Sequence, residues 1–150
     1  MLQQKVEKLA SQYQKDIISI RRHLHQYPEL SFEEKQTGAY IASQLADMDV
    51  EHQHGVADNG VVAMIKGKSP RKKVVALRAD IDALPIQESN EVDYKSKHDG
   101  IMHACGHDVH TASLLGVAKI LNELRGDFEG TVKLIFQPAE ERLPGGASIM

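Results

Sequence analysis

The stretch "DVHTASLLGVAKILNELRGDFEGTVKLIF", residues 108–136, decides the fold class. From Asp108 to Leu124 the apolar residues go almost all the way round a helix, which indicates that this helix is mostly buried. Gly126 favours the end of the helix, and the run Thr131–Phe136, closed by Pro138, predicts a strand. The stretch therefore predicts a helix that packs on most of its sides, followed by a strand.

The residues before this stretch also alternate between helix and strand patterns. Apolar residues at three- and four-residue steps predict a long first helix that stops before Pro28. Ser31 and Glu34 have the spacing of a capping box and predict a second helix that runs to about Met48. Short runs rich in strand-forming residues follow at residues 50–54, 61–66 and 74–78. Turn residues between the last two favour a hairpin, and the whole pattern predicts an α/β fold with a mixed sheet flanked by helices.

Composition and charge place the chain among ordinary globular proteins. Its 150 residues are 41% hydrophobic and 26% charged, and the formal net charge of -3 provides no strong field for nucleic acid or an anionic membrane. The first residues lack the apolar run of a signal peptide, and no later run is long enough to cross a bilayer. A single cysteine fits a reducing compartment. We therefore expect a cytoplasmic protein without nucleic-acid or membrane partners.

Residue types that bind metals gather in "HACGHD", residues 103–108. Cys105 and His107 are two positions apart, a spacing that points both side chains the same way in an extended loop but not in a helix. Gly106 between them lets the backbone bend closely. A thiolate and an imidazole together favour zinc, with manganese or nickel as alternatives. The crowding favours a metal site over two other interpretations, a buried structural cysteine and a cysteine nucleophile activated by histidine.

Two acidic pairs follow predicted strands. Asp80 and Asp82 come after the third predicted strand, and Glu140 and Glu141 after the fourth. Ligands gather beyond the carboxyl ends of strands in α/β sheets, so both pairs are candidates for the same site. A loop or helix-capping role competes with this for the aspartates, and a solvated charge pair for the glutamates. Ordinary surface or hydrogen-bonded positions are expected for His23, His25, His52, His54 and His98.

Four motifs in register carry a resemblance to a known family. The segments "RRHLHQYPELSFEE", "LRADIDALPI", "MHACGHDVHTASLLG" and "FQPAEE…PGGA" resemble the amidohydrolase branch of the aminoacylase and carboxypeptidase metallopeptidase family. That branch includes N-acyl-amino-acid amidohydrolases, hippurate hydrolases and auxin-conjugate hydrolases. The resemblance implies a zinc-peptidase-like catalytic domain that holds two divalent ions, zinc or manganese, and needs no organic cofactor. It also implies hydrolysis of the amide bond of an N-acyl amino acid or a related small conjugate.

The same resemblance implies roles for single residues. It assigns the metal ligands as Cys105, which bridges the two ions, His107 and Glu141. Glu140 resembles the general base, which takes a proton from the metal-bound water as that water attacks the amide carbonyl. Asp80 departs from the related peptidases, which have a metal-binding histidine at that place. The roles left open are those of Asp80, Asp82, His103 and His110.

Length is the largest departure from the family. Its members run to more than twice 150 residues and carry an inserted ferredoxin-like lid or dimerisation domain, with further ligands after the "PGGA" motif. We therefore interpret residues 1–150 as the amino-terminal part of the catalytic domain, and a homo-oligomer would form through the further domain. These ligands suffice for about one ion, so we expect the isolated chain to be inactive. The alternative is a truncated, non-catalytic remnant or binding module of the family.

Overall fold

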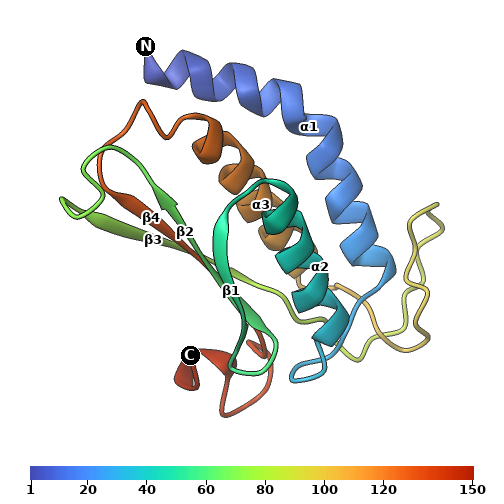
Figure 1. The fold of residues 1–150 in the computed structure, drawn as a ribbon. Coiled ribbons are helices and arrows are strands. Elements are labelled where there is room, and N and C mark those ends of the chain that lie inside the picture. The colour runs from blue at the N-terminus through green and yellow to red at the C-terminus, as the bar shows by residue number, and fades with distance from the viewer.

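The computed structural model describes all residues, 1–150, and places three helices on one side of a four-stranded sheet (Figure 1). The elements are α1 (Leu2–Gln26), α2 (Lys35–Asp47), β1 (Glu51–Val56), β2 (Gly60–Lys66), β3 (Val74–Asp80), α3 (His107–Glu123), β4 (Thr131–Gln137) and a short 3-10 turn, η1 (Gly146–Ser148). The predicted α/β class and the predicted elements are confirmed, with boundaries that shift by one or two residues at most elements.

The sheet is mixed, as expected, but one predicted pairing is wrong. Its strand order is β1-β2-β4-β3, with antiparallel β1–β2 and β2–β4 pairs and a parallel β3–β4 pair. The expected hairpin between β2 and β3 does not form, because β4 lies between them. Leu134 in β4 pairs with Ala63 on one side and with Leu77 on the other, and it is fully buried. The apolar strand β4 thus takes the inner position, and β1 and β2 form the hairpin instead.

Helix α3 packs closely against α1. The buried residues of α3 extend along its length, as its apolar pattern predicts, and Ala112, Leu114, Leu115 and Ala118 belong to the main core. A side chain at Gly116 would place its Cβ 2.6 Å from Cδ1 of Ile17 in α1, so a larger residue at this position would require the Ile17 side chain to move. None of the helices combines the length and apolar character that crossing a membrane requires.

The edge strand β3 leaves apolar surface uncovered. Val74, Val75 and Leu77 are 59%, 44% and 38% exposed, and no other strand pairs with the free edge of β3. Unpaired strand edges with apolar side chains promote association with other chains. This surface lies on the strand that ends in Asp80, next to the acidic residues singled out in the sequence.

The predicted capping box at Ser31 and Glu34 is wrong, because both side chains have distant partners. The Ser31 hydroxyl donates to Asp82 at 2.7 Å, and α2 begins at Lys35 without a side-chain cap. Glu34 is fully buried and accepts a hydrogen bond from the backbone N–H of Ala139 at 2.7 Å and another from the Asn59 side chain at 3.1 Å. The segment before α2 is therefore tied to the segments that follow β3 and β4.

We predict that Glu34→Ala destabilises the fold by about 1–3 kcal/mol, because it leaves the buried N–H of Ala139 without its acceptor and removes one of the two acceptors of the Asn59 amide, the other being the Phe32 carbonyl. Urea unfolding followed by circular dichroism measures this change. Glu33→Ala is the matched control, since Glu33 is the exposed neighbour of Glu34. Equal unfolding midpoints for the two variants would show that the Glu34 contacts add no stability.

Candidate metal centre

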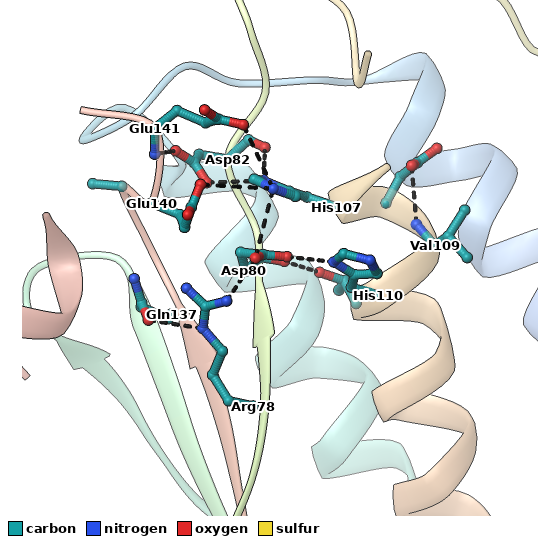
Figure 2. Close-up of polar contacts among 12 residues, drawn as sticks. Arg78, Asp80, Asp82, His107, Val109, His110, Gln137, Glu140 and Glu141 are labelled. Atoms are coloured by element: carbon teal, nitrogen blue, oxygen red, sulfur yellow. Dashed lines mark hydrogen bonds and ion pairs between the residues drawn. The ribbon is translucent and has the colours of Figure 1, made fainter. Parts of the chain in front are cut away.

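The candidate site lies where β3, β4 and the start of α3 meet (Figure 2). Because β3 and β4 are parallel, their carboxyl ends reach the same edge of the sheet, and Asp80 pairs with Gln137 in register. Glu140 and Glu141 follow β4 closely, and His107 is the first residue of α3. The two acidic pairs and the cysteine–histidine motif, which are far apart in the sequence, therefore come together as the strand pattern predicts.

His107 is the centre of the cluster. Its Nδ1 lies 2.9 Å from the backbone oxygen of Asp82 and 3.1 Å from Oδ1 of the same residue. Nδ1 thus donates to Asp82, and the lone pair of the neutral ring is on Nε2. Carboxylate oxygens surround that nitrogen at 3.6 Å from Asp80, 3.7 Å from Glu141 and 3.9 Å from Glu140. These distances are too long for hydrogen bonds, but they suit donors around an ion about 2 Å from each.

Cys105 completes a set of donors typical of a metal site. One donor atom each from Cys105, His107 and Glu141 lies within 4.8 Å of the others. Gly106 has a φ of 99°, a left-handed conformation that favours glycine, and it joins the loop to α3. Cys105 lies in the loop, as predicted, whereas His107 already belongs to the helix. Thiolate, imidazole and carboxylate donors that converge in this way fit a zinc-like ion.

The environment of Cys105 differs from that of an activated nucleophile. A hydrogen bond to Glu141 raises the pKa of the Cys105 thiol, and burial and the negative charges of Glu141, Glu140 and Asp80 raise it further. Cysteine nucleophiles are activated by a lowered pKa, usually next to a cation. This environment therefore does not fit a cysteine nucleophile that is activated without a metal ion.

Asp82 supports the cluster from behind. Its Oδ2 accepts hydrogen bonds from the Ser31 hydroxyl at 2.7 Å and from the backbone N–H of Glu141 at 2.9 Å, while His107 donates to Oδ1. Burial raises the pKa of Asp82, but these donors outweigh burial and lower it to about 2. Asp82 therefore positions His107 and Glu141 and caps no helix.

Asp80 has different partners. Arg78 contacts its Oδ2 at 2.7 Å, and Nδ1 of His110 contacts its Oδ1 at 2.7 Å. His110 lies one turn after His107 on α3, so both rings face the end of β3 (Figure 2). Donor atoms of Asp80, His107 and His110 also lie within 4.8 Å of one another. A second potential donor set thus shares His107 with the first.

A buried network that the sequence interpretation missed supports the start of α3. His25 in α1, only 3% exposed, lies 2.7 Å from Asp108 and 3.0 Å from Glu88 through its two ring nitrogens. Asp108 follows His107 directly, so this network ties the candidate site to α1. The only signal for this network in the sequence was that His25 lies in the first motif. An ordinary surface or hydrogen-bonded position was expected for His25, and the structure shows a hydrogen-bonded one.

His103 is buried next to this network without a partner. It is 5% exposed, and its Nε2 makes no hydrogen bond. Burial lowers the pKa of His103 to about 4, with a smaller opposing effect from Asp108. The His103 ring is therefore neutral at physiological pH. It belongs to neither set of potential metal donors.

Comparison with known proteins identifies the family. Residues 76–150 match the model of peptidase family M20/M25/M40. The chain belongs to this family of metal-dependent hydrolases, which confirms the resemblance drawn from the four motifs. The match begins within β3 and includes both acidic pairs and the cysteine–histidine loop.

Individual relatives agree with this assignment. The chain is 45% identical over its full length to an N-acyl-L-amino acid amidohydrolase of Geobacillus stearothermophilus, and 50% identical over 93% of its length to an N-acetyl-L-cysteine deacetylase of Bacillus subtilis. The solved structure of the Bacillus subtilis YXEP protein, described as a dinuclear metal binding peptidase from the M20 family, matches 90% of the chain with a TM-score of 0.83 and 48% identity. The chain spans 40%, 33% and 38% of these three proteins.

We predict that the pH dependence of stability changes in Asp82→Asn, measured with a chelator present. The pKa of Asp82 is lowered from 3.8 to about 2, so the ionised carboxylate stabilises the fold above pH 3.8 and loses this effect as the pH falls towards 2. The variant should be less stable than the wild type by about 2 kcal/mol at neutral pH, and the difference should shrink on acidification. Asp99→Asn, at an exposed aspartate, is the control. A difference that does not vary with pH contradicts the assignment.

We also predict that a bound ion protects Cys105 from alkylation. Iodoacetamide should modify the ion-free chain faster at higher pH, because the raised pKa keeps the thiol protonated at neutral pH. Zinc or manganese should slow the reaction at least about tenfold, and a chelator should restore it, since the ion and the reagent compete for the same sulfur lone pairs. In His107→Ala the ion should protect little. Equal rates with and without metal in the wild type would remove Cys105 from the site.

Proposed function

We propose that the protein containing this chain hydrolyses the amide bond of N-acyl amino acids or related small conjugates, with Glu140 as the general base. The observation that carries the proposal is the arrangement around Nε2 of His107, which faces three carboxylates at 3.6–3.9 Å and shares a donor set with Cys105. Family membership supports metal-dependent hydrolysis, and the names of two relatives, an N-acyl-L-amino acid amidohydrolase and an N-acetyl-L-cysteine deacetylase, support the substrate class.

Cys105, His107 and Glu141 are the proposed metal ligands, with zinc or manganese as the ion. The description of one relative as dinuclear supports a second divalent ion, for which Cys105 would also serve as a ligand and whose other ligands would come from segments outside residues 1–150. When bound, such ions polarise the amide carbonyl and make a water molecule easier to deprotonate. The rigid support of His107 and Glu141 by Asp82 would keep both ligands in place.

Glu140 is suited to proton transfer by its position. Its side chain is 39% exposed and its Oε2 lies 3.9 Å from Nε2 of His107, so it borders the proposed ion position and remains accessible to a substrate. The backbone on either side is held by Glu34, which accepts from the N–H of Ala139, and by Asp82, which accepts from the N–H of Glu141. Ala139, the residue before Glu140, has a left-handed φ of 48°, and Figure 2 shows both glutamates beside His107.

The proposed reaction needs one proton transfer in each direction. Glu140 would take a proton from water as the water oxygen forms a bond to the amide carbon. The protonated Glu140 would then give that proton to the amide nitrogen as the carbon–nitrogen bond breaks. The products are the free carboxylic acid of the acyl group and the free amine of the amino acid, so no other reactant is required.

The proposal also includes the domain organisation, the compartment and the oligomeric state of the enzyme. Residues 1–150 would form the amino-terminal part of a catalytic domain, with a lid or dimerisation domain in the remaining length that the relatives possess. The single cysteine supports a cytoplasmic enzyme, and the near-neutral charge supports one that acts on small molecules without nucleic-acid or membrane partners. A homo-oligomer would form through the additional domain.

We predict that Glu140→Gln lowers turnover of N-acyl amino acids by about 100-fold or more and leaves metal content unchanged, because it removes a proton acceptor and no ligand. The assay uses the longest in-frame product of the gene, found by sequencing beyond codon 150, with metal content measured by atomic emission. Glu141→Gln, the matched neighbour, should lose metal. Loss of metal in Glu140→Gln would overturn the base assignment. Residues 1–150 alone should show only background activity, and the absence of turnover in every product would favour a non-catalytic binding module.

A further inference from the structure

Asp80 and His110 remain unused by the proposed hydrolysis, yet they lie beside its central histidine. Asp80 is 5% exposed and presents its Oδ2 at 3.6 Å from Nε2 of His107. His110 is half exposed and contacts the other oxygen of Asp80. Together with His107 these residues form a group in which one donor atom from each lies within 4.8 Å of the others. We propose that Asp80, His107 and His110 form a second cation site, which competes with the Cys105–His107–Glu141 site for a single ion.

The competition follows from the tautomer of His107. Its Nδ1 donates to the backbone and side-chain oxygens of Asp82, so only Nε2 has a lone pair to offer. Asp80 and Glu141 both approach this same nitrogen, at 3.6 Å and 3.7 Å. One lone pair binds one ion. An ion held by His107 can therefore be completed by Cys105 and Glu141, or by Asp80 and His110, but two ions cannot both use His107.

The geometry of the Asp80 site needs only a small adjustment. Donors around a tetrahedral zinc ion are about 3.3 Å apart, because bonds from zinc to nitrogen and oxygen are about 2.0–2.1 Å. The Asp80–His107 separation of 3.6 Å is close to that value, and the Asp80–His110 contact of 2.7 Å has to widen. His110 can move outward because its side chain is 55% exposed. It borders an open hollow of about 440 Å³, which gives an ion a path from solvent.

Charge predicts which site is stronger. Arg78 contacts Asp80 at 2.7 Å and offsets part of its negative charge, so an ion at Asp80 has to compete with a guanidinium. Neither a lysine nor an arginine forms an ion pair with Glu141, whose nearby ring is that of His107, and a thiolate from Cys105 adds a strong bond to zinc-like metals. The Asp80 site is therefore the weaker one and fills when Cys105 is absent or chemically blocked. This inference concerns binding alone and does not depend on the proposed hydrolysis.

Cobalt(II) titration of the 150-residue chain tests the inference, because a cobalt–thiolate bond gives a charge-transfer absorption that oxygen and nitrogen ligands do not. The wild type should bind one Co²⁺ with the thiolate band. Cys105→Ser should still bind one Co²⁺, without that band and more weakly. Adding His110→Ala to Cys105→Ser should weaken binding at least about tenfold, as expected for loss of a direct ligand. In the wild-type background His110→Ala should leave Co²⁺ affinity and the thiolate band unchanged.

The matched control is His54→Ala in the Cys105→Ser background, since His54 is an exposed histidine on β1. It should bind Co²⁺ as Cys105→Ser does. Proton NMR of the Cys105→Ser chain adds a test that needs no further substitution, because a cobalt ligand has strongly shifted ring protons and His110 should show them. Unshifted His110 protons, equal affinity with and without His110, or two Co²⁺ ions that are both lost in His107→Ala would each overturn the inference. The thiolate band of the wild type reports separately on the Cys105 site used in the proposed function.

Discussion

The buried carboxylate of Asp82 is the interaction on which the site depends. It is 1% exposed, and it accepts hydrogen bonds from the Ser31 hydroxyl, the His107 ring and the backbone N–H of Glu141. These donors come from the segment before α2, the start of α3 and the turn after β4, three parts of the chain that no local interaction connects. A buried carboxylate without partners would be strongly destabilising, so each of the three segments that donates to Asp82 adds to the stability of the fold. The site is thus assembled by the same contact that closes the fold.

This contact also determines the chemistry of His107. With Nδ1 donating to Asp82, a flip of the ring or a change of tautomer would lose the hydrogen bonds to the backbone and side-chain oxygens of Asp82. Nε2 therefore points permanently at Asp80, Glu140 and Glu141. A second tie acts from the other side, where His25 holds Asp108, the next residue of α3, at 2.7 Å. The histidine is fixed before any ion arrives, so little conformational entropy is lost when one binds.

Local sequence patterns predicted the helices and the position of the candidate site. They failed for strand pairing and helix capping, which depend on residues far away in the sequence. Amphipathic spacing predicted α1 well, because it reports directly on the buried face, and the nearly continuous ring of apolar residues predicted the packing of α3. Metal-philic residues after strands predicted that Asp80, Glu140 and His107 would meet, because parallel strands end at one edge. The β2–β3 hairpin was wrong because a short polar turn between two strands does not reveal that β4 will insert between them. The Ser31–Glu34 spacing was also ambiguous, since the same two side chains can cap a helix or reach Asp82 and Ala139.

The balance of charge explains why this edge of the sheet suits a cation. Asp80, Glu140 and Glu141 converge on one neutral nitrogen, and Arg78 pairs with only the first of them. Bringing carboxylates this close costs free energy unless a positive charge lies between them. Without an ion, a proton partly fills that role: burial lowers the pKa of His107, but the hydrogen bond to Asp82 and the charge of Asp80 outweigh burial and raise it. A divalent ion supplies twice the charge of that proton at the same nitrogen. The ion and the proton therefore compete for Nε2, and metal binding releases the proton.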